Sequence, residues 1–261
     1  MTPTGKVYLI GAGPGDAELL TLRALRMLQS ADAVVHDRLV SQDILDLAPA
    51  GVRMIPVGKA PKCHTVPQDR INEILAELAE QGLTVARLKG GDPLIFGRGS
   101  EEAAYLADRG LAVEYAPGIT AAQGMAAATG IPLTHRGLAT GVRYVTGHRA
   151  ADQRLDLDWA SLADTDTTLV VYMGAANISE IALNLMREGM PASLPVMAIC
   201  AATTSQESRL ISRLDQIGVD IRAQPMPAPV LFVIGRVVSL YQAGTGATGT
   251  AARRPAVAAG E

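Results

Sequence analysis

The feature that most constrains the fold is the segment 88–102, which reads LKGGDPLIFGRGSEE. The apolar residues before it predict a buried strand that ends at Gly90. The pair Gly90-Gly91 permits a backbone bend that side chains would obstruct, and Pro93 cannot continue the hydrogen-bond ladder of a strand. Open α/β sheets bind ligands at the carboxyl ends of their strands. We therefore expect a flat ligand to lie against bare backbone here, with a tight surface turn as the plainer alternative.

Apolar runs alternate with amphipathic stretches through the first half of the chain. Strands are predicted at residues 6–10, 33–35, 54–57, 84–88 and 112–115. Helices are predicted at about residues 19–28, 67–81, 101–108 and 121–129. The second of these helices carries Ile71, Ile74, Leu75 and Leu78 at helical spacing. The alternation indicates βαβ units with a mostly parallel sheet, so the predicted fold class is α/β.

The second half of the chain repeats this style. Strands are predicted at residues 142–146, 169–173, 196–200, 208–211 and 230–234, and a helix at 178–186. We place a domain boundary at Arg136, which divides the chain into an α/β domain of residues 1–135 and a second α/β domain of residues 136–243. The remaining residues, 244–261, are mostly small and predict a disordered tail.

The composition excludes several classes of protein. Of 261 residues, 48% are hydrophobic and 19% are charged, which is typical of a well-buried globular α/β protein. A formal charge of -3 and an aromatic content of 3% argue against a nucleic-acid partner. The sequence shows neither a basic-then-apolar leader nor an apolar run of membrane-span length. We therefore expect a soluble protein with no membrane partner.

The cysteines and histidines do not have the spacing of a metal site. Cys63 and Cys200 are far apart, which does not suit a disulfide framework and predicts a reducing, cytoplasmic location. The histidines are His36, His64, His135 and His148. No pair of them has the i, i+4 or H-x-H spacing of metal ligands, so we expect no metal. His64 or His135 could instead contact a carboxylate of a bound ligand.

A second glycine-rich segment, GAGPGD at residues 11–16, follows the first predicted strand. It departs from the dinucleotide fingerprint G-x-G-x-x-G because Asp16 replaces the third glycine and Pro14 disturbs the turn. It is not a P-loop either, since no Gly-Lys-Ser/Thr follows it. The segment is thus a structural turn or a ligand loop of another kind. A nucleotide-binding oxidoreductase and a non-catalytic nucleotide-binding domain remain as alternative classes.

These motifs, together with QDRIN at 68–72, PGITA at 117–121 and YVTGH at 144–148, resemble those of the tetrapyrrole methylases, a family that uses S-adenosyl-L-methionine. The likeness runs from about residue 6 to residue 241 and is greatest to the members that methylate uroporphyrinogen III. It implies two α/β domains with the active site in the cleft between them. It also implies a homodimer and S-adenosyl-L-homocysteine as the spent donor.

The resemblance further implies which residues contact the methyl donor. By matched position they are Pro14, Gly90, Gly91, Asp92, Ile95, Phe96, Thr120, Ala121, Met173, Ala202 and Val230. Met173 would ordinarily be a core methionine. In this family position its soft thioether suits a sulfonium and the edge of an adenosine.

Three arginines lie beside glycines or at predicted strand ends: Arg38, Arg98 and Arg136. Each of them alone would ordinarily form a surface ion pair. Together they suit a macrocycle that bears many carboxylates, because a guanidinium group pairs with a carboxylate as a fork. With Met173, they are the predicted substrate contacts.

The implied reaction transfers two methyl groups, one at a time, to ring carbons of uroporphyrinogen III. The product is precorrin-2, formed by way of precorrin-1, at the entry to sirohaem- and cobalamin-type tetrapyrroles. No metal is needed, because the sulfonium is already a strong electrophile. A methylase of the same fold acting on a later precorrin is the alternative.

Arg98 and Glu101 are the predicted catalytic pair, since they stand three residues apart at a predicted helix start and can face the same side. Arg98 is expected to position the macrocycle and to stabilise developing negative charge, because an arginine stays protonated and makes a poor base. Glu101 is expected to hold the guanidinium or to relay the proton. A first-turn acid that only stabilises the helix dipole is the alternative for Glu101.

Overall fold

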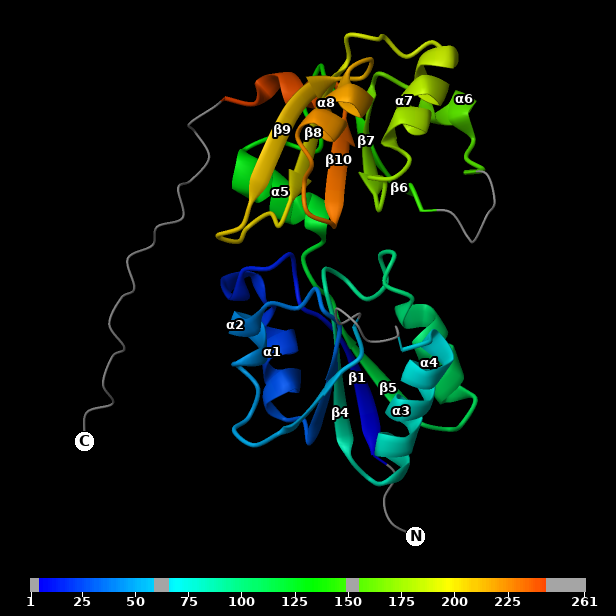
Figure 1. The fold of residues 1–261 in the computed structure, drawn as a ribbon. Helices are drawn as coiled ribbons and strands as arrows, with labels where there is room; N and C mark the ends of the chain where they lie inside the picture. Colours follow the sequence, from blue (N-terminus) through cyan, green and yellow to red (C-terminus); the bar gives the residue numbers. More distant parts are fainter. Residues whose placement is uncertain (1–4, 59–65, 149–154, 243–261) are drawn as a thin grey trace, which may run out of the picture.

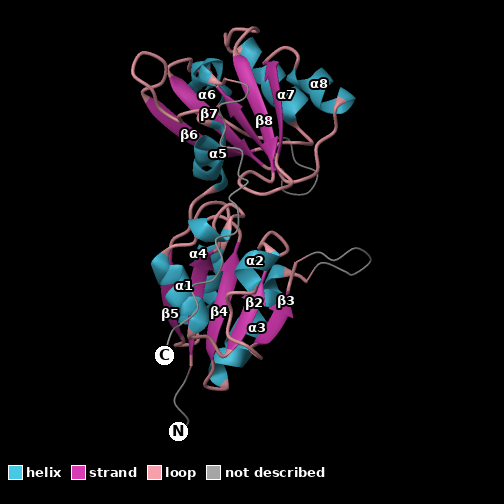
Figure 2. Ribbon diagram, turned by 90° about the vertical axis from the view of Figure 1, so that its left-hand side faces the viewer, coloured by secondary structure: helices cyan, strands magenta, loops and turns pink. Residues whose placement is uncertain are grey.

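The computed structural model describes residues 5–58, 66–148 and 155–242. The chain forms two lobes, each built on a five-stranded sheet with helices packed against it (Figure 1), and the lobes are stacked end to end (Figure 2). Within the described ranges, no helix has both the length and the apolar character needed to cross a membrane. The predicted disordered tail, Cys63 and His64 lie outside the described residues.

The first sheet is wholly parallel, as predicted from the sequence. Its strands are β1 (Lys6–Gly11), β2 (Ala33–His36), β3 (Arg53–Pro56), β4 (Thr84–Lys89) and β5 (Ala112–Ala116), in the order β3-β2-β4-β1-β5. Its helices are α1 (Leu22–Gln29), α2 (Gln42–Leu45), α3 (Gln68–Glu80) and α4 (Gly99–Ala107). Helices α3 and α4 cover one face, and α1 and α2 cover the other. The carboxyl ends of the strands face the second lobe (Figure 1).

The second sheet is mixed. Its strands are β6 (Gly141–Thr146), β7 (Thr167–Tyr172), β8 (Pro195–Cys200), β9 (Ser208–Arg213) and β10 (Val230–Ile234), in the order β6-β7-β10-β8-β9. Only β6 and β7 pair in parallel. The second α/β domain predicted from the sequence is present, but the sequence pattern of this half does not specify strand direction. The physical reason for antiparallel pairing is visible at β8 and β9, because the short link between them leaves no room for a crossover helix.

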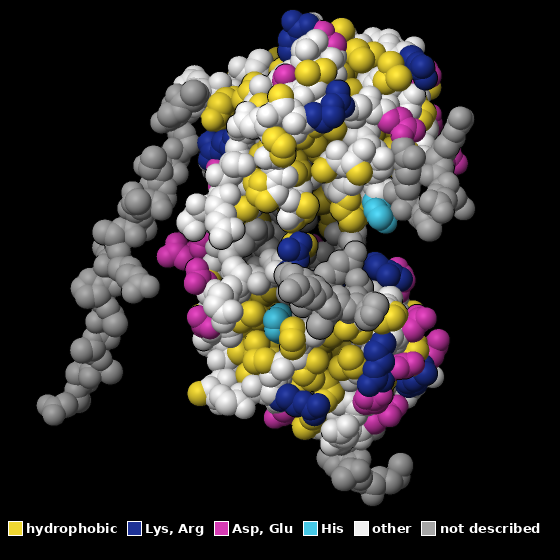
Figure 3. Space-filling model, in the orientation of Figure 1, with side chains coloured by type: hydrophobic (Ala, Val, Ile, Leu, Met, Phe, Trp, Pro, Cys, Tyr) yellow, Lys and Arg dark blue, Asp and Glu magenta, His cyan; other side chains and the backbone are white. Residues whose placement is uncertain are grey.

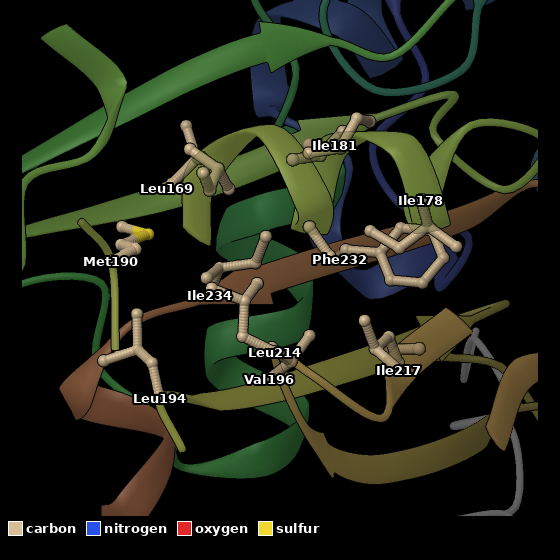
Figure 4. Packing of buried hydrophobic residues seen from close by; sticks show 14 of the residues in the cluster. Leu169, Ile178, Ile181, Met190, Leu194, Val196, Leu214, Ile217, Phe232 and Ile234 are labelled. Carbon is tan, nitrogen blue, oxygen red and sulfur yellow. The ribbon is translucent and has the colours of Figure 1, made fainter. Parts of the chain in front are cut away.

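Helices cover both faces of the second sheet. They are α5 (Ala121–Thr129), α6 (Trp159–Leu162), α7 (Ile178–Arg187) and α8 (Ile217–Ala223). On one face, Ile178 and Ile181 of α7 pack with Phe232 of β10 (Figure 4). On the other face, Met125 of α5 is fully buried against a cluster that includes Val233 of β10.

The packing of α5 bears on where the lobes divide. Ala122, Met125 and the following Ile131 all belong to a core cluster of the second sheet. The boundary at Arg136 stays a prediction. On the strength of these contacts we propose that the chain changes lobe earlier, in the stretch 117–120 that connects β5 to α5.

Candidate functional site

Glycines bring the carboxyl ends of the first sheet into close backbone contact. Gly13 and Gly91 exchange two hydrogen bonds, with N···O distances of 3.1 and 2.7 Å. A Cβ atom on Gly118 would lie 2.1 Å from the carbonyl oxygen of Gly91, so only glycine fits there. Gly91 has a φ of +69°, and a Cβ on it would come no closer than 3.9 Å to Thr120 and Ala121. The result is the bare backbone expected from the sequence, open on the side of α5.

Asp92 has a structural role at this edge of the first sheet. Its Oδ1 accepts a hydrogen bond from the amide of Leu94 at 2.8 Å, and its Oδ2 accepts one from the amide of Gly118 at 3.0 Å. Oδ1 therefore fixes the turn that follows Asp92, and Oδ2 joins this loop to the loop of Gly118. The role of Asp92 as a donor contact remains a prediction.

The loop after Asp92 reaches the second lobe. Its side chains Leu94, Ile95 and Phe96 are exposed to 56%, 37% and 41%, which is high for apolar residues in one short segment. Phe96 adopts the left-handed region with a φ of 52°. Its ring contacts Tyr172 at the end of β7, with centroids 5.0 Å apart. A loop of the first sheet and a strand end of the second thus meet across the cleft.

Met173 follows Tyr172 directly and shares the strained geometry. Its φ is 55°, and its side chain is 45% exposed, so it is not a core methionine. Backbone strain of this kind persists where the surrounding structure imposes it, and such positions cluster at ligand sites. Met173 is therefore an exposed residue that directly follows Tyr172, whose ring contacts Phe96.

Helix α5 begins at the same place. Thr120 caps its first turn, and Thr120 and Gln123 form a reciprocal capping box. The hydroxyl of Tyr172 accepts a hydrogen bond from the amide of Ala122 at 3.3 Å. Burial raises the pKa of Tyr172. The sequence pattern did not single out this tyrosine, although it directly precedes Met173 in the predicted strand 169–173.

Of the remaining predicted donor contacts, Pro14 and Ala202 lie where the two lobes touch. A Cβ on Gly124 of α5 would lie 2.5 Å from Cβ of Pro14, so the GAGPGD loop packs against that helix. The amide of Asp16 donates to Thr203 Oγ1 at 3.2 Å. The side chains of Ala202 and Val230 are buried in the core of the second lobe, so a ligand could reach these two residues only at their backbone.

Arg98 and Glu101 form the fork expected from their spacing. The guanidinium donates from Nε to Oε1 at 3.0 Å and from Nη2 to Oε2 at 2.6 Å. Hydrogen bonding to Arg98 lowers the pKa of Glu101, and the same contact raises the pKa of Arg98. Both side chains are 54% exposed, which leaves them accessible to a ligand.

The other two arginines are exposed and lie on separate elements. Arg38 follows β2, and a Cβ on Gly58 would lie 2.4 Å from its amide nitrogen. Arg136 lies in the turn that is closed by the bridge between His135 and Ala139. Within the described part of the chain, neither makes an ion pair. The structure thus leaves both guanidinium groups available but does not bring the three arginines into mutual contact.

The hollows on the surface differ in character. Figure 3 shows the molecule hollowed at the waist between the lobes, with apolar side chains of the second lobe bordering the hollow. An open depression of about 420 Å³ is lined by His36, Asp46 and their neighbours on the first lobe. Over the described ranges, no three His, Cys, Asp or Glu side chains converge in a way that would hold a metal ion.

Comparison with known proteins identifies relatives over most of the chain. The uroporphyrinogen-III C-methyltransferase of Paracoccus denitrificans (strain Pd 1222) is 62% identical over 238 residues, which are 91% of this chain and 83% of the relative. The S-adenosyl-L-methionine-dependent uroporphyrinogen III methyltransferase, chloroplastic, of Arabidopsis thaliana is 48% identical over 237 residues, which are 90% of this chain and 64% of that protein.

The fold has close counterparts among solved structures. The uroporphyrin-III C-methyl transferase of Thermus thermophilus, solved in complex with S-adenyl homocysteine, superimposes with a TM-score of 0.77 at 39% identity, covering 90% of this chain and 94% of that one. The model of the family Tetrapyrrole (Corrin/Porphyrin) Methylases matches residues 6–218. This chain belongs to the tetrapyrrole methylases.

Proposed function

We propose that this chain is an S-adenosyl-L-methionine-dependent C-methyltransferase that converts uroporphyrinogen III to precorrin-2. The Paracoccus and Arabidopsis proteins, whose names state methyl transfer to uroporphyrinogen III, are 62% and 48% identical to it. The observation that carries the proposal is the contact of Phe96 with Tyr172, because it joins the loop that follows the glycine edge to the strand end that precedes Met173. Two methyl groups are added in succession, and precorrin-1 is the product of the first transfer.

The residues of the cleft fit the methyl donor. Gly91 offers backbone that a Cβ would cover, and its open side faces the first turn of α5. We assign the thioether of Met173 and the ring of Phe96 to the same site, because apolar, polarisable groups suit an adenosine and a sulfonium. Thr120 and Ala121 complete the wall from the second lobe. When bound, S-adenosyl-L-methionine supplies an electrophilic methyl group there.

Arg98 is assigned to the substrate and to the charge that develops on it. Its guanidinium is held by Glu101 and stays protonated throughout the working pH range, so it can pair with a carboxylate or stabilise negative charge on the macrocycle. Glu101 orients the guanidinium and stays ionised because its pKa is lowered, so its carboxylate can accept the proton that the methylated ring carbon loses and release it to solvent. Arg38 and Arg136 are exposed and are assigned to carboxylates at the periphery of the ring.

The test is an anaerobic incubation of the chain with uroporphyrinogen III and isotopically labelled S-adenosyl-L-methionine, followed by mass spectrometry. We expect two labelled methyl groups in the product and S-adenosyl-L-homocysteine in equal amount to the methyl groups transferred. A single methyl group would indicate a methylase that acts elsewhere on the ring. No methyl transfer together with retained donor binding would indicate a non-catalytic domain.

Assembly and location form a second part of the proposal. We propose a homodimer because the family resemblance implies one, and sedimentation analysis would test it. A cytoplasmic location is proposed from the cysteine content, of which the described Cys200 is a buried free thiol. The formal charge of -3 supports a small-molecule substrate over a nucleic acid.

A further inference from the structure

A buried cluster of charged side chains adjoins the glycine edge and has no part in the reaction as assigned above. It consists of Arg87 and Lys89 of β4 and Glu102 of α4, with side-chain exposures of 2%, 5% and 0%. Burial lowers the pKa of Lys89, and the neighbouring Arg87 acts in the same direction. Burying charged side chains lowers the stability of the folded state unless the charges are very well paired. A buried charged cluster beside the proposed site is therefore a candidate for a functional role.

One oxygen of Glu102 accepts most of the hydrogen bonds in the cluster. Its Oε1 accepts from Lys89 Nζ at 2.9 Å, from Arg87 Nε and Nη2 at 3.2 Å each, and from Gln68 Nε2 at 3.1 Å. The other oxygen, Oε2, is buried and has no hydrogen-bond partner among the described residues. Arg87 also donates to Asp37 Oδ1 at 2.7 Å. A single carboxylate oxygen therefore ties the end of β4 to the first turn of α4.

The two segments that Glu102 joins, the end of β4 and the start of α4, both adjoin residues of the proposed site. Lys89 is followed directly by Gly90 and the bare glycine edge. At the other end, the amide of Glu102 donates to the carbonyl oxygen of Arg98 at 3.2 Å, and Glu101 precedes it in the same turn. Arg98 is fixed in the left-handed region with a φ of 58°. Any shift of the Glu102 backbone would therefore move the Arg98–Glu101 pair with it.

We propose that Glu102 is a positioning residue, which sets the distance between the glycine edge and the Arg98–Glu101 pair by tying α4 to β4. This inference rests on the proposed methyltransferase function. It makes the reach of the Glu102 side chain more important for turnover than its charge. A misplacement of about 1 Å can reduce the rate of an aligned reaction by about 100-fold.

Two substitutions separate reach from charge. Glu102→Gln keeps the reach, because its amide oxygen can accept the same donors while its NH₂ group takes the place of the partnerless Oε2. Glu102→Asp keeps the charge but shortens the side chain by about 1.5 Å. We expect E102D to lower kcat by about 100-fold, while E102Q keeps most of it. Calorimetry should show that both variants still bind S-adenosyl-L-homocysteine, and each rate is expressed per binding site so that unfolded protein does not count.

Exposed Glu77 of α3, paired with Arg70 at 2.6 Å, is the matched control. Glu77→Asp and Glu77→Gln should both leave kcat unchanged. If Glu102 only stabilised the fold, E102Q would be more damaging than E102D. The reason is that E102Q would remove negative charge from beside the two buried cations. An E102D variant as active as the parent chain, or an E102Q variant as impaired as E102D, overturns the inference.

Lys89→Met tests the same tie from β4 and serves if E102D does not fold. It too should lower kcat while donor binding is retained, and a kcat close to that of the parent chain would overturn the inference. A parent chain that transfers no methyl group contradicts the proposed function itself. An active parent chain with unaffected variants contradicts only the role of Glu102.

Discussion

Phe96 of the first lobe and Tyr172 of the second are in ring contact, with centroids 5.0 Å apart and planes inclined at 50°. Tyr172 also meets Tyr144 edge-on at 5.6 Å and accepts a hydrogen bond from the amide of Ala122. One side chain thus joins the loop after β4, the end of β7 and the start of α5. These three segments hold most of the residues assigned to the methyl donor.

Tyr172→Phe should weaken donor binding without disturbing the ring contacts. The substitution removes the hydroxyl that receives the Ala122 amide, and an unpaired buried polar group costs about 1–3 kcal/mol. We expect a lower melting temperature and a higher dissociation constant for S-adenosyl-L-homocysteine by calorimetry. Tyr144→Phe is the control, because the Tyr144 hydroxyl has no partner among the described residues. Equal affinities for the two variants would contradict the role given to Tyr172.

Gly91→Ala should abolish donor binding by occupying the space that the donor needs. A residue with a side chain would be strained to almost the same extent at Gly91 and at Gly110, because their φ values are +69° and +70°. At either position the added Cβ would have no close neighbour. Placing an L-residue in this region costs about 1–2 kcal/mol, so both alanine variants should lose similar stability. Only G91A should lose affinity for S-adenosyl-L-homocysteine, since Gly110 lies at the far end of α4. A G91A variant that binds the donor as G110A does would remove Gly91 from the site.

The sequence predicts local structure well where the pattern of apolar residues is clear. The bounds of α5 and β10 were predicted to the residue, because a capped run of small residues and an uninterrupted apolar run each admit one assignment. Strand direction in the second sheet was not predictable in this way. Strand β10 inserts between β7 and β8 through contacts with residues far away in the chain, which leave no mark on local periodicity.

The candidate site shows the same division. The Arg98–Glu101 fork was predictable because its spacing is local, within a single helical turn. The hydrogen bond from the Ala122 amide to Tyr172 and the ties of Glu102 to β4 were not, since they depend on which faces of distant elements meet. Asp92 was predicted as a donor contact, but the sequence could not show that both of its oxygens hold loops in place.

The ionisation of Glu101 should depend on Arg98. The hydrogen bond from the guanidinium lowers the pKa of Glu101, so the fork forms fully above the ordinary pKa of a glutamate and is lost as the pH falls through the lowered value. The stabilisation from this pair is therefore an acid-side effect and does not change between pH 6 and pH 8. An NMR titration of ¹³C-labelled carboxylates should show the Glu101 pKa returning toward its ordinary value in R98L. An unchanged pKa in that variant would mean that another group holds Glu101 ionised.

Arg98→Leu should retain donor binding and lose methyl transfer, because the substitution removes the cation assigned to the macrocycle while leaving the glycine edge and Met173 in place. Loss of one charge-stabilising donor typically lowers kcat by about 100-fold or more. The matched control is Arg70→Leu, since Arg70 and Glu73 form an i, i+3 pair of similar exposure, at 47% and 49%, on the outer surface of α3. R70L should turn over uroporphyrinogen III at the parent rate. Mass spectrometry of the product and calorimetry with S-adenosyl-L-homocysteine distinguish the two effects, and near-normal turnover by R98L would show that the macrocycle is positioned by other residues.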